Sequence, residues 1–192
     1  MRVNGGKVKG LRLMGAVSSG TRATTGRARS AIFNILPGEL YQEGKVLDLF
    51  AGSGSLGIEA LSRGAGWVDF VELDRRQCQV IRTNLQTTGF TAISEVQCAD
   101  VGRRLDGLTE KYQLVLMDPP YAMEELGPVL EKLGEEKGPV AEGGMLVVGH
   151  SRFLELQPEY GALRRVSLRR YGDNVVEFFE KTSREDQKSD QQ

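Results

Sequence analysis

The middle of the chain repeats one pattern: an apolar run of strand length is followed by a segment whose apolar residues recur at helical spacing. The apolar runs cover residues 45–50, 67–73, 93–99, 112–118 and 143–150, and the helical segments cover 54–64, 74–89, 100–108 and a stretch ending at 136. Strands that alternate with helices through short loops form a parallel sheet with helices on both faces. The pattern therefore predicts an α/β fold.

The two ends of the chain depart from this alternation. Residues 163–172 and 174–181 read as two strands joined at a Gly-Asp-Asn turn, so we expect a mostly parallel seven-stranded sheet that ends in an antiparallel hairpin. Residues 7–13 predict a short strand, 18–27 a mobile loop, and 25–36 a helix capped by Thr24 or Thr25. The polar residues 182–192 predict a disordered tail.

The net charge of −1 hides an uneven distribution. Residues 1–38 contain seven basic residues and no acid, whereas the rest of the chain holds all 26 acidic residues. A basic arm on an acidic body suits a polyanion such as a nucleic acid, although a solvated arm without a partner is the alternative. We therefore divide the chain into a basic extension (1–38) and an α/β domain (39–181). The candidate RNA contacts from charge are Lys7, Lys9, Arg12, Arg22, Arg27 and Arg29.

Cysteine, histidine and apolar content set further expectations. Cys78 and Cys98 are too few for a disulfide framework, and both fall in predicted core segments, so we expect buried free thiols. A single histidine, His150, cannot build a Cys/His metal cluster, so no metal is expected. Neither a membrane-spanning run nor a signal-peptide pattern is found in the sequence, which predicts a cytoplasmic protein.

A glycine-rich turn follows the first apolar run, in VLDLFAGSGSLG (46–57). Gly52 and Gly54 let the backbone approach a ligand at the start of a helix. Asp48, just before the turn, suits an amine-bearing ligand better than a pyrophosphate, and Glu72, at the end of the next strand, can bind both hydroxyls of a ribose. An amine and an unphosphorylated ribose describe S-adenosylmethionine, with a helix entry that binds no ligand as the alternative. Ala51 and Leu73, beside these residues, complete this part of the predicted cofactor site.

Asp100 ends the third strand and precedes Val101. Asp100 can accept a hydrogen bond from an adenine amine, and it is equally suited to cap the helix that follows. Because the carboxyl ends of parallel strands meet at one edge of a sheet, we expect it near Asp48 and Glu72. Asp100 and Val101 are therefore included in the predicted cofactor site.

The fourth strand ends in Asp118-Pro119-Pro120-Tyr121. The Asp118 carboxylate and the Pro119 carbonyl could accept the two N–H groups of an exocyclic amine, and two prolines would hold these acceptors in place. Tyr121 offers a ring on which a flipped-out or unpaired base can stack. These four residues are the predicted catalytic site for methyl transfer. A rigid turn with Asp118 as a helix cap is the alternative.

These motifs resemble those of known protein families. The stretches Asp48–Gly54, Glu72–Asp74 and Asp118–Tyr121 resemble class I S-adenosylmethionine-dependent methyltransferases, and Gly5–Leu13 with Arg22–Asn34 is similar to the RsmD-type rRNA guanine-N2 methyltransferases. The resemblance implies a Rossmann-like fold and a monomer that methylates one guanine N2 in 16S rRNA of a partly assembled small subunit. It also implies that Thr24, Thr25, Arg27 and Asn34 lie near the cofactor and RNA entrance.

The chain departs from the family pattern at Ala23, Gly26 and Gly149, where the family commonly has Pro, Asp and Glu. These departures bear on substrate contacts, and His150 after Gly149 is expected to be a polar strand-end residue. The acid-Pro-Pro-aromatic motif does not by itself separate guanine N2 from adenine N6. An adenine-N6 methyltransferase of DNA or RNA, and a non-catalytic RNA-binding protein on the same fold, remain the alternatives.

Overall fold

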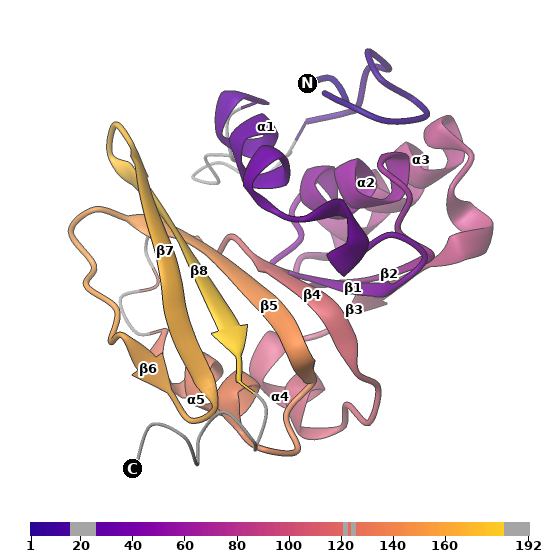
Figure 1. Cartoon of the computed structure of the whole chain (residues 1–192). Helices are drawn as coiled ribbons and strands as arrows, with labels where there is room; N and C mark the ends of the chain where they lie inside the picture. Colours follow the sequence, from indigo (N-terminus) through magenta and orange to yellow (C-terminus); the bar gives the residue numbers. More distant parts are fainter. Residues whose placement is uncertain (16–25, 121–122, 124–125, 183–192) are drawn as a thin grey trace, which may run out of the picture.

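The computed structural model describes residues 1–15, 26–120, 123 and 126–182, and its centre is one mixed sheet in the order β3-β2-β1-β4-β5-β8-β7-β6 (Figure 1). The first five strands in this order pair in parallel, and β5, β8, β7 and β6 pair antiparallel. The strands are β1 (Lys45–Leu49), β2 (Trp67–Glu72), β3 (Ser94–Cys98), β4 (Tyr112–Met117), β5 (Val140–Ser151), β6 (Glu159–Tyr160), β7 (Leu163–Tyr171) and β8 (Asn174–Lys181). The predicted fold class is confirmed. The sheet has eight strands rather than seven, because the two-residue β6 is too short to leave a periodic pattern.

Helices cover both faces of the sheet (Figure 1). They are α1 (Gly26–Ile35), α2 (Ser55–Ser62), α3 (Arg75–Thr88), α4 (Val101–Asp106) and α5 (Gly127–Gly134), with short 3-10 turns η1 (Gly38–Leu40) and η2 (Thr91–Ile93). Residues of α1, α2 and α3 share one buried apolar cluster with the sheet, and residues of α4 and α5 share another. In Figure 1 these two groups of helices lie on opposite sides of the central strands.

Residues 7–13 do not form the predicted strand. Gly6 and Gly10 have φ angles of 76° and 86°, so the chain turns where an extended strand was expected. The segment closes on itself through Val3 N–H, which donates to Leu11 O at 3.0 Å, and it docks on α2 through Lys7 N–H, which donates to Ser62 O at 2.6 Å. The local spacing of apolar residues reflects this docking rather than a strand.

A buried ion cluster joins this N-terminal segment to the sheet and its helices. Glu59 of α2 is fully buried and accepts from Arg63 Nε at 2.8 Å and from the backbone N–H of Asn4 at 2.8 Å. Arg29 of α1 lies 3.4 Å from the same carboxylate and donates to Arg2 O at 2.5 Å. Because Arg29 is only 1% exposed, its predicted role as an RNA contact does not fit the structure. Its positive charge instead pairs with the buried carboxylate of Glu59.

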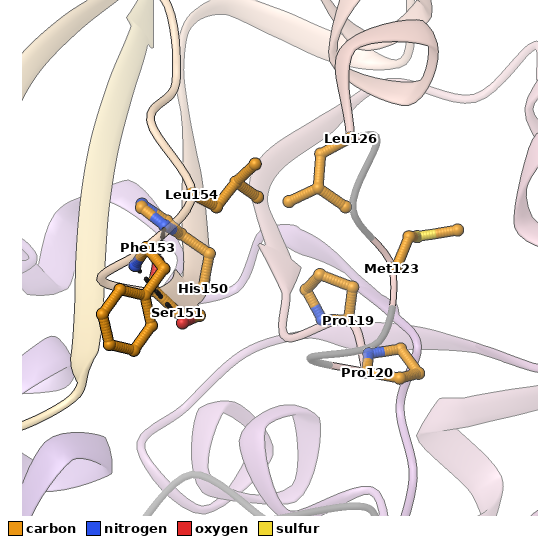
Figure 2. A pocket seen from close by; sticks show the side chains of 8 residues that line it. All are labelled: Pro119, Pro120, Met123, Leu126, His150, Ser151, Phe153 and Leu154. Atoms are coloured by element: carbon orange, nitrogen blue, oxygen red, sulfur yellow. Dashed lines mark hydrogen bonds between the residues drawn. The ribbon is translucent and has the colours of Figure 1, made fainter.

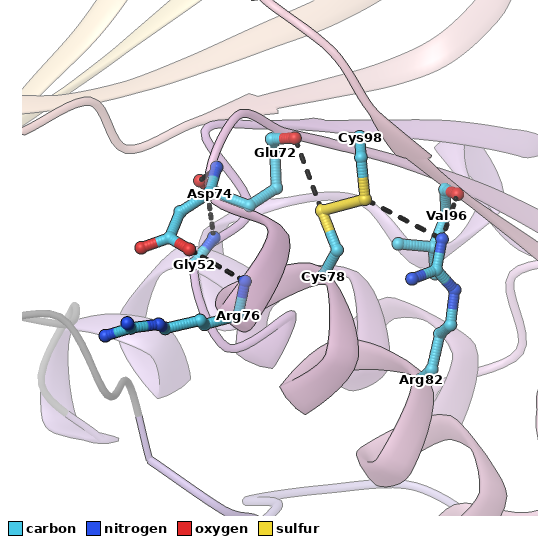
Figure 3. Close-up of a disulfide and its surroundings, with 8 residues drawn as sticks. All are labelled: Gly52, Glu72, Asp74, Arg76, Cys78, Arg82, Val96 and Cys98. Atoms are coloured by element: carbon cyan, nitrogen blue, oxygen red, sulfur yellow. Dashed lines mark hydrogen bonds between the residues drawn. A yellow bond between two sulfur atoms is a disulfide. The ribbon is translucent and has the colours of Figure 1, made fainter.

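The expectation of two buried free thiols is wrong. A disulfide joins Cys78 of α3 to Cys98 at the end of β3, and Cys98 is exposed (Figure 3). The two residues are 20 positions apart, and helix α3 packs back on β3 so that their Cα atoms are 6.1 Å apart. The disulfide lies beside the turn that follows β2, where Cys78 Sγ is 3.4 Å from Glu72 O.

Gly57 of α2 provides a test of the close packing of α2 against β2. A Cβ atom at position 57 would lie 2.4 Å from Cε1 of Phe70 on β2, so Gly57→Ala should destabilise the protein by about 1–3 kcal/mol despite alanine's higher helix propensity. Gly127→Ala in α5 is the matched control, because a Cβ there meets nothing within 4 Å. Urea unfolding of both variants measures the difference. Equal stability of the two would contradict the close approach of α2 to β2.

Candidate functional site

The predicted acidic residues converge at the carboxyl edge of the parallel strands. Leu49 of β1 pairs with Val71 of β2 and with Met117 of β4, so the residues that follow these strands emerge at the same level. Asp48 is close enough to Glu72 and Asp118 for both to act on its charge. The structure therefore brings together the acidic residues of two motifs that are far apart in the sequence.

Glu72 holds the glycine-rich turn in place (Figure 3). Its Oε2 accepts from Gly52 N–H at 2.8 Å, and its Oε1 accepts from Asp74 N–H at 2.9 Å. Gly52 and Gly54 have φ angles of 54° and 75°, which explains why glycine is required there. A carboxylate has about four acceptor positions, so Glu72 retains acceptor capacity for ligand hydroxyls.

Asp48 is the buried acid of the site. It is 1% exposed, and its Oδ2 accepts from Gly57 N–H at 2.9 Å. Burial raises its pKa well above the ordinary value, the hydrogen bond from Gly57 opposes this rise, and the charges of Asp118 and Glu72 add to it. A cation placed between these carboxylates would relieve the repulsion, as the amine of the predicted cofactor would.

The other predicted cofactor residues surround this turn. Ala51 is buried, and its N–H donates to Val71 O at 3.1 Å. Leu73 is 68% exposed, so an apolar side chain is available next to Glu72. Asp100 Oδ1 caps α4 by accepting from Arg103 N–H at 3.0 Å, which confirms the capping alternative, and Val101 behind it is buried. The ribose acceptor Glu72, the exposed Leu73 and the buried acid Asp48 fit the predicted cofactor.

The end of β4 places Asp118 beside β5. Asp118 is half-buried, Pro119 is buried and Pro120 is exposed, and Pro120 O accepts from Met123 N–H at 2.9 Å. A Cβ atom at Gly149 of β5 would lie 2.7 Å from Asp118 Oδ1. The glycine at position 149, one of the departures from the family pattern, therefore lets the carboxylate lie directly against β5. Tyr121 lies outside the described residues.

A pocket of about 420 Å³ opens beside the two prolines (Figure 2). One wall is made by residues from the end of β4 to the start of α5, and the facing wall is made by the end of β5 and the turn after it. The lining residues are Pro119, Pro120, Met123, Leu126, His150, Ser151, Phe153 and Leu154. Apart from the prolines and a minor role for His150, the sequence analysis missed them. The rule that ligands bind at carboxyl ends of strands, applied to β5 as well, would have found them.

His150 is held by a buried polar network. Its Nδ1 lies 2.9 Å from Ser151 O, and its Nε2 lies 3.1 Å from Glu177 Oε1. The other oxygen of Glu177 accepts from Arg165 Nη1 at 2.9 Å. Both ring nitrogens face acceptors, so the two contacts are both hydrogen bonds when the imidazole carries two protons. This arrangement gives His150 a structural role in the pocket wall.

The predicted RNA contacts fall into three groups. Lys7, Lys9, Arg12 and Arg27 are exposed, as is Asn34 on α1. Arg29 is buried in the ion cluster described above. Arg22, Thr24 and Thr25, and most of the loop predicted at 18–27, lie outside the described residues, as does the tail from 183 to 192. Among the described residues, no group of three His, Cys, Asp or Glu side chains could hold a metal ion, and no helix is long and apolar enough to cross a membrane.

Comparison with known proteins places the chain among methyltransferases. A family model described as "Conserved hypothetical protein 95" matches residues 1–180. The chain is 35% identical to "Putative rRNA methyltransferase YlbH" of Bacillus subtilis over 94% of this chain and 99% of the relative. It is 33% identical to "Ribosomal RNA small subunit methyltransferase D" of Escherichia coli K12, over 77% and 73% of the two chains. The solved structure of "Putative methyltransferase yhhF" from Escherichia coli superposes with a TM-score of 0.82 at 26% identity, over 96% and 99% of the two chains.

The burial of Asp48 predicts a pH dependence of stability. Because folding raises the pKa of this carboxyl above its ordinary value of 3.8, the protonated form favours folding, and that contribution is lost as pH rises through the raised pKa. Asp48→Asn cannot ionise, so its advantage in free energy of unfolding over the wild type should grow from pH 4 to pH 8. Urea unfolding at both pH values measures it, with the exposed Asp106→Asn as control. A pH-independent difference would contradict the raised pKa.

Proposed function

We propose that this chain, which belongs to the RsmD-type family described as conserved hypothetical protein 95, methylates small-subunit rRNA at N2 of a guanine with S-adenosylmethionine as donor. The observation that carries the proposal is the convergence of Asp48, Glu72 and Asp118 at one sheet edge, next to the pocket beside Pro119. The names of the relatives support rRNA as the substrate class.

The residues around the glycine-rich turn would hold the cofactor. Glu72 would accept from the ribose hydroxyls, Asp48 would face the amine, and Leu73 would pack against the adenine with Asp100 and Val101 nearby. When bound, S-adenosylmethionine supplies a methyl group on a positively charged sulfur. The packing of α2 and the two hydrogen bonds of Glu72 hold the turn in one conformation, which supports the proposal that this ligand binds there.

Asp118, Pro119 and Pro120 would then hold the target amine. The lone pair of an exocyclic amine is delocalised into the base, so the nitrogen is a weak nucleophile. Acceptors at the Asp118 carboxylate and the Pro119 carbonyl would grip its two N–H groups and direct the lone pair toward the methyl group. The nitrogen would become cationic as its bond to the methyl group forms and the methyl–sulfur bond of the donor breaks. The Asp118 carboxylate would stabilise this charge and accept the proton that the nitrogen then loses, which leaves a neutral methylated amine and a neutral thioether. Tyr121 remains the proposed stacking partner of the base.

The pocket beside the prolines is the proposed place for the target base. Its volume of about 420 Å³ exceeds that of a single nucleobase, and most of its lining residues are apolar. A base in a helix would have to flip out to enter it. The basic extension (residues 1–38) would contact the RNA backbone, and residues 39–181 would carry the chemistry. We further propose that the enzyme acts as a cytoplasmic monomer on a partly assembled small subunit.

Transfer of labelled methyl groups tests this function. Naked 16S rRNA and small subunits from cells lacking this protein would be incubated with the enzyme and labelled S-adenosylmethionine, and the modified base would be mapped. Label on guanine N2 supports the proposal, and label on adenine N6 would replace the proposed target atom. No transfer to either RNA, with cofactor binding intact by calorimetry, would refute the proposal.

Asp118→Ala separates chemistry from cofactor binding. The substitution removes one amine acceptor and the stabilising charge, so methyl transfer should fall at least a hundredfold, on the order expected for a transition-state electrostatic contact. Cofactor affinity by calorimetry should stay within a few fold. Asp106→Ala, an exposed acid on α4, is the control and should retain activity. Equal loss of binding and turnover in Asp118→Ala would show a structural role instead.

The exposed basic residues predict a salt-dependent RNA affinity. Lys9→Ala and Arg27→Ala should each weaken RNA binding. Each should also reduce the slope of log affinity against log salt by about one unit, as expected for the loss of one phosphate contact. Lys45→Ala is the control, because Lys45 begins β1 at the opposite edge of the sheet, where it pairs with Glu110. Filter binding to 16S rRNA at several salt concentrations measures the slopes. Unchanged slopes in Lys9→Ala and Arg27→Ala would exclude the arm as the RNA contact.

A further inference from the structure

We infer that Phe153, in the turn after β5, is the residue on which the RNA nucleotide next to the target base stacks, an inference that rests on the proposed function. Phe153 is 80% exposed, yet it contributes to the wall of the pocket that faces Pro119 and Pro120 (Figure 2). A ring this exposed stands at the rim of the pocket rather than at its floor. It therefore meets a neighbouring nucleotide rather than the base inside.

The turn that carries Phe153 is held in a defined position. Leu154 N–H donates to Ser151 O at 3.0 Å, and Phe153 N–H donates to Ser151 Oγ at 3.3 Å. Arg152 N–H donates to Asp173 O at 2.9 Å, which ties the turn to the tip of the β7–β8 hairpin. An aromatic ring on a braced turn loses little conformational freedom when a base stacks on it.

Arg152 extends the same surface with a positive charge. Its guanidinium carbon lies 4.8 Å from the centre of the Phe153 ring, a cation–π contact that covers one side of the ring. Arg152 also pairs with Asp173 at 3.1 Å, with both side chains more than half exposed. The guanidinium therefore lies beside the ring, from where it would attract the phosphate of a stacked nucleotide.

Two further arginines lie at the same level of the sheet. Arg169 and Arg170 of β7 pair with Val176 and Val175 of β8, and these valines pair with Gly149 and His150 at the end of β5. Both arginines are exposed. Successive side chains of a strand point to opposite faces of the sheet, so each face carries one of the two arginines. The hairpin therefore adds positive charge to the end of the sheet that holds Phe153, and a polyanion is the partner that this region suits.

Exposed apolar residues are common on protein surfaces, so exposure alone would not carry the inference. Among the large apolar side chains that the structure describes as exposed, however, Phe153 is the only aromatic one. It is also the one that combines a braced turn, a stacked arginine and a place in the wall of the candidate substrate pocket. Single-strand binding proteins combine aromatic rings and basic residues in the same way.

Substitutions at Phe153 test the inference. Phe153→Ala should weaken binding of 16S rRNA, naked or in small subunits from cells lacking this protein, by about tenfold, in line with the loss of one stacked base. Cofactor affinity and the thermal midpoint should not change. Phe153→Trp should restore the affinity, and the added indole should be quenched when RNA binds, against the emission of Trp67. Val166→Ala, an exposed apolar residue of β7, is the matched control and should bind like the wild type.

The outcomes separate this inference from the proposed function. If the wild type transfers methyl groups to rRNA and Phe153→Ala binds and reacts equally well, the stacking role is refuted and the proposed function stands. An unquenched indole in Phe153→Trp at saturating RNA would also refute it. If the wild type neither binds nor methylates rRNA, the proposed function and this inference both fail.

Discussion

The parallel pairing of β1 between β2 and β4 is the constraint on which the rest of the site depends. It brings the ends of three strands to one level, and with them three carboxylates that repel one another. The cost is visible at Asp48, whose pKa is raised by burial and by its two acidic neighbours. A fold selected for stability alone would not gather these charges. A fold that binds a cationic ligand and stabilises transient positive charge on a reacting nitrogen, as proposed above, would gather them, because the ligand supplies the missing positive charge.

The basic extension is positioned by interactions that hide some of its own charge. Glu59 binds Arg29, Arg63 and the backbone of Asn4, and so fixes the first residues of the chain on α2. Asn84 of α3 adds a second tie, because its side chain bonds both to Met14 and to Ser53 in the glycine-rich turn. The extension and the candidate cofactor turn therefore share supports. Lys7, Lys9 and Arg27 remain exposed on this fixed segment.

Comparison of the sequence predictions with the structure shows where local patterns are sufficient. The strands and helices of the α/β core were predicted within a few residues, because burial on both faces leaves long apolar runs and because Asp74 and Gly89 mark the ends of α3. The errors in predicted secondary structure concern one very short strand and one segment that docks on a helix. The two-residue β6 has no period to detect, and residues 7–13 imitate a strand because they pack on α2 through turns at Gly6 and Gly10.

By itself the sequence determined the fold class, the order of the main elements and the acidic residues at the strand ends, because each of these depends on patterns within a few neighbouring positions. Only the tertiary structure decided which basic residues are exposed, that Cys78 meets Cys98, and that the turn after β5 completes a pocket with Pro119 and Pro120. Each of these depends on contacts between residues far apart in the chain. Arg29 and Lys9 look alike in the sequence, and only the position of Glu59 in space makes one a structural residue and leaves the other at the surface.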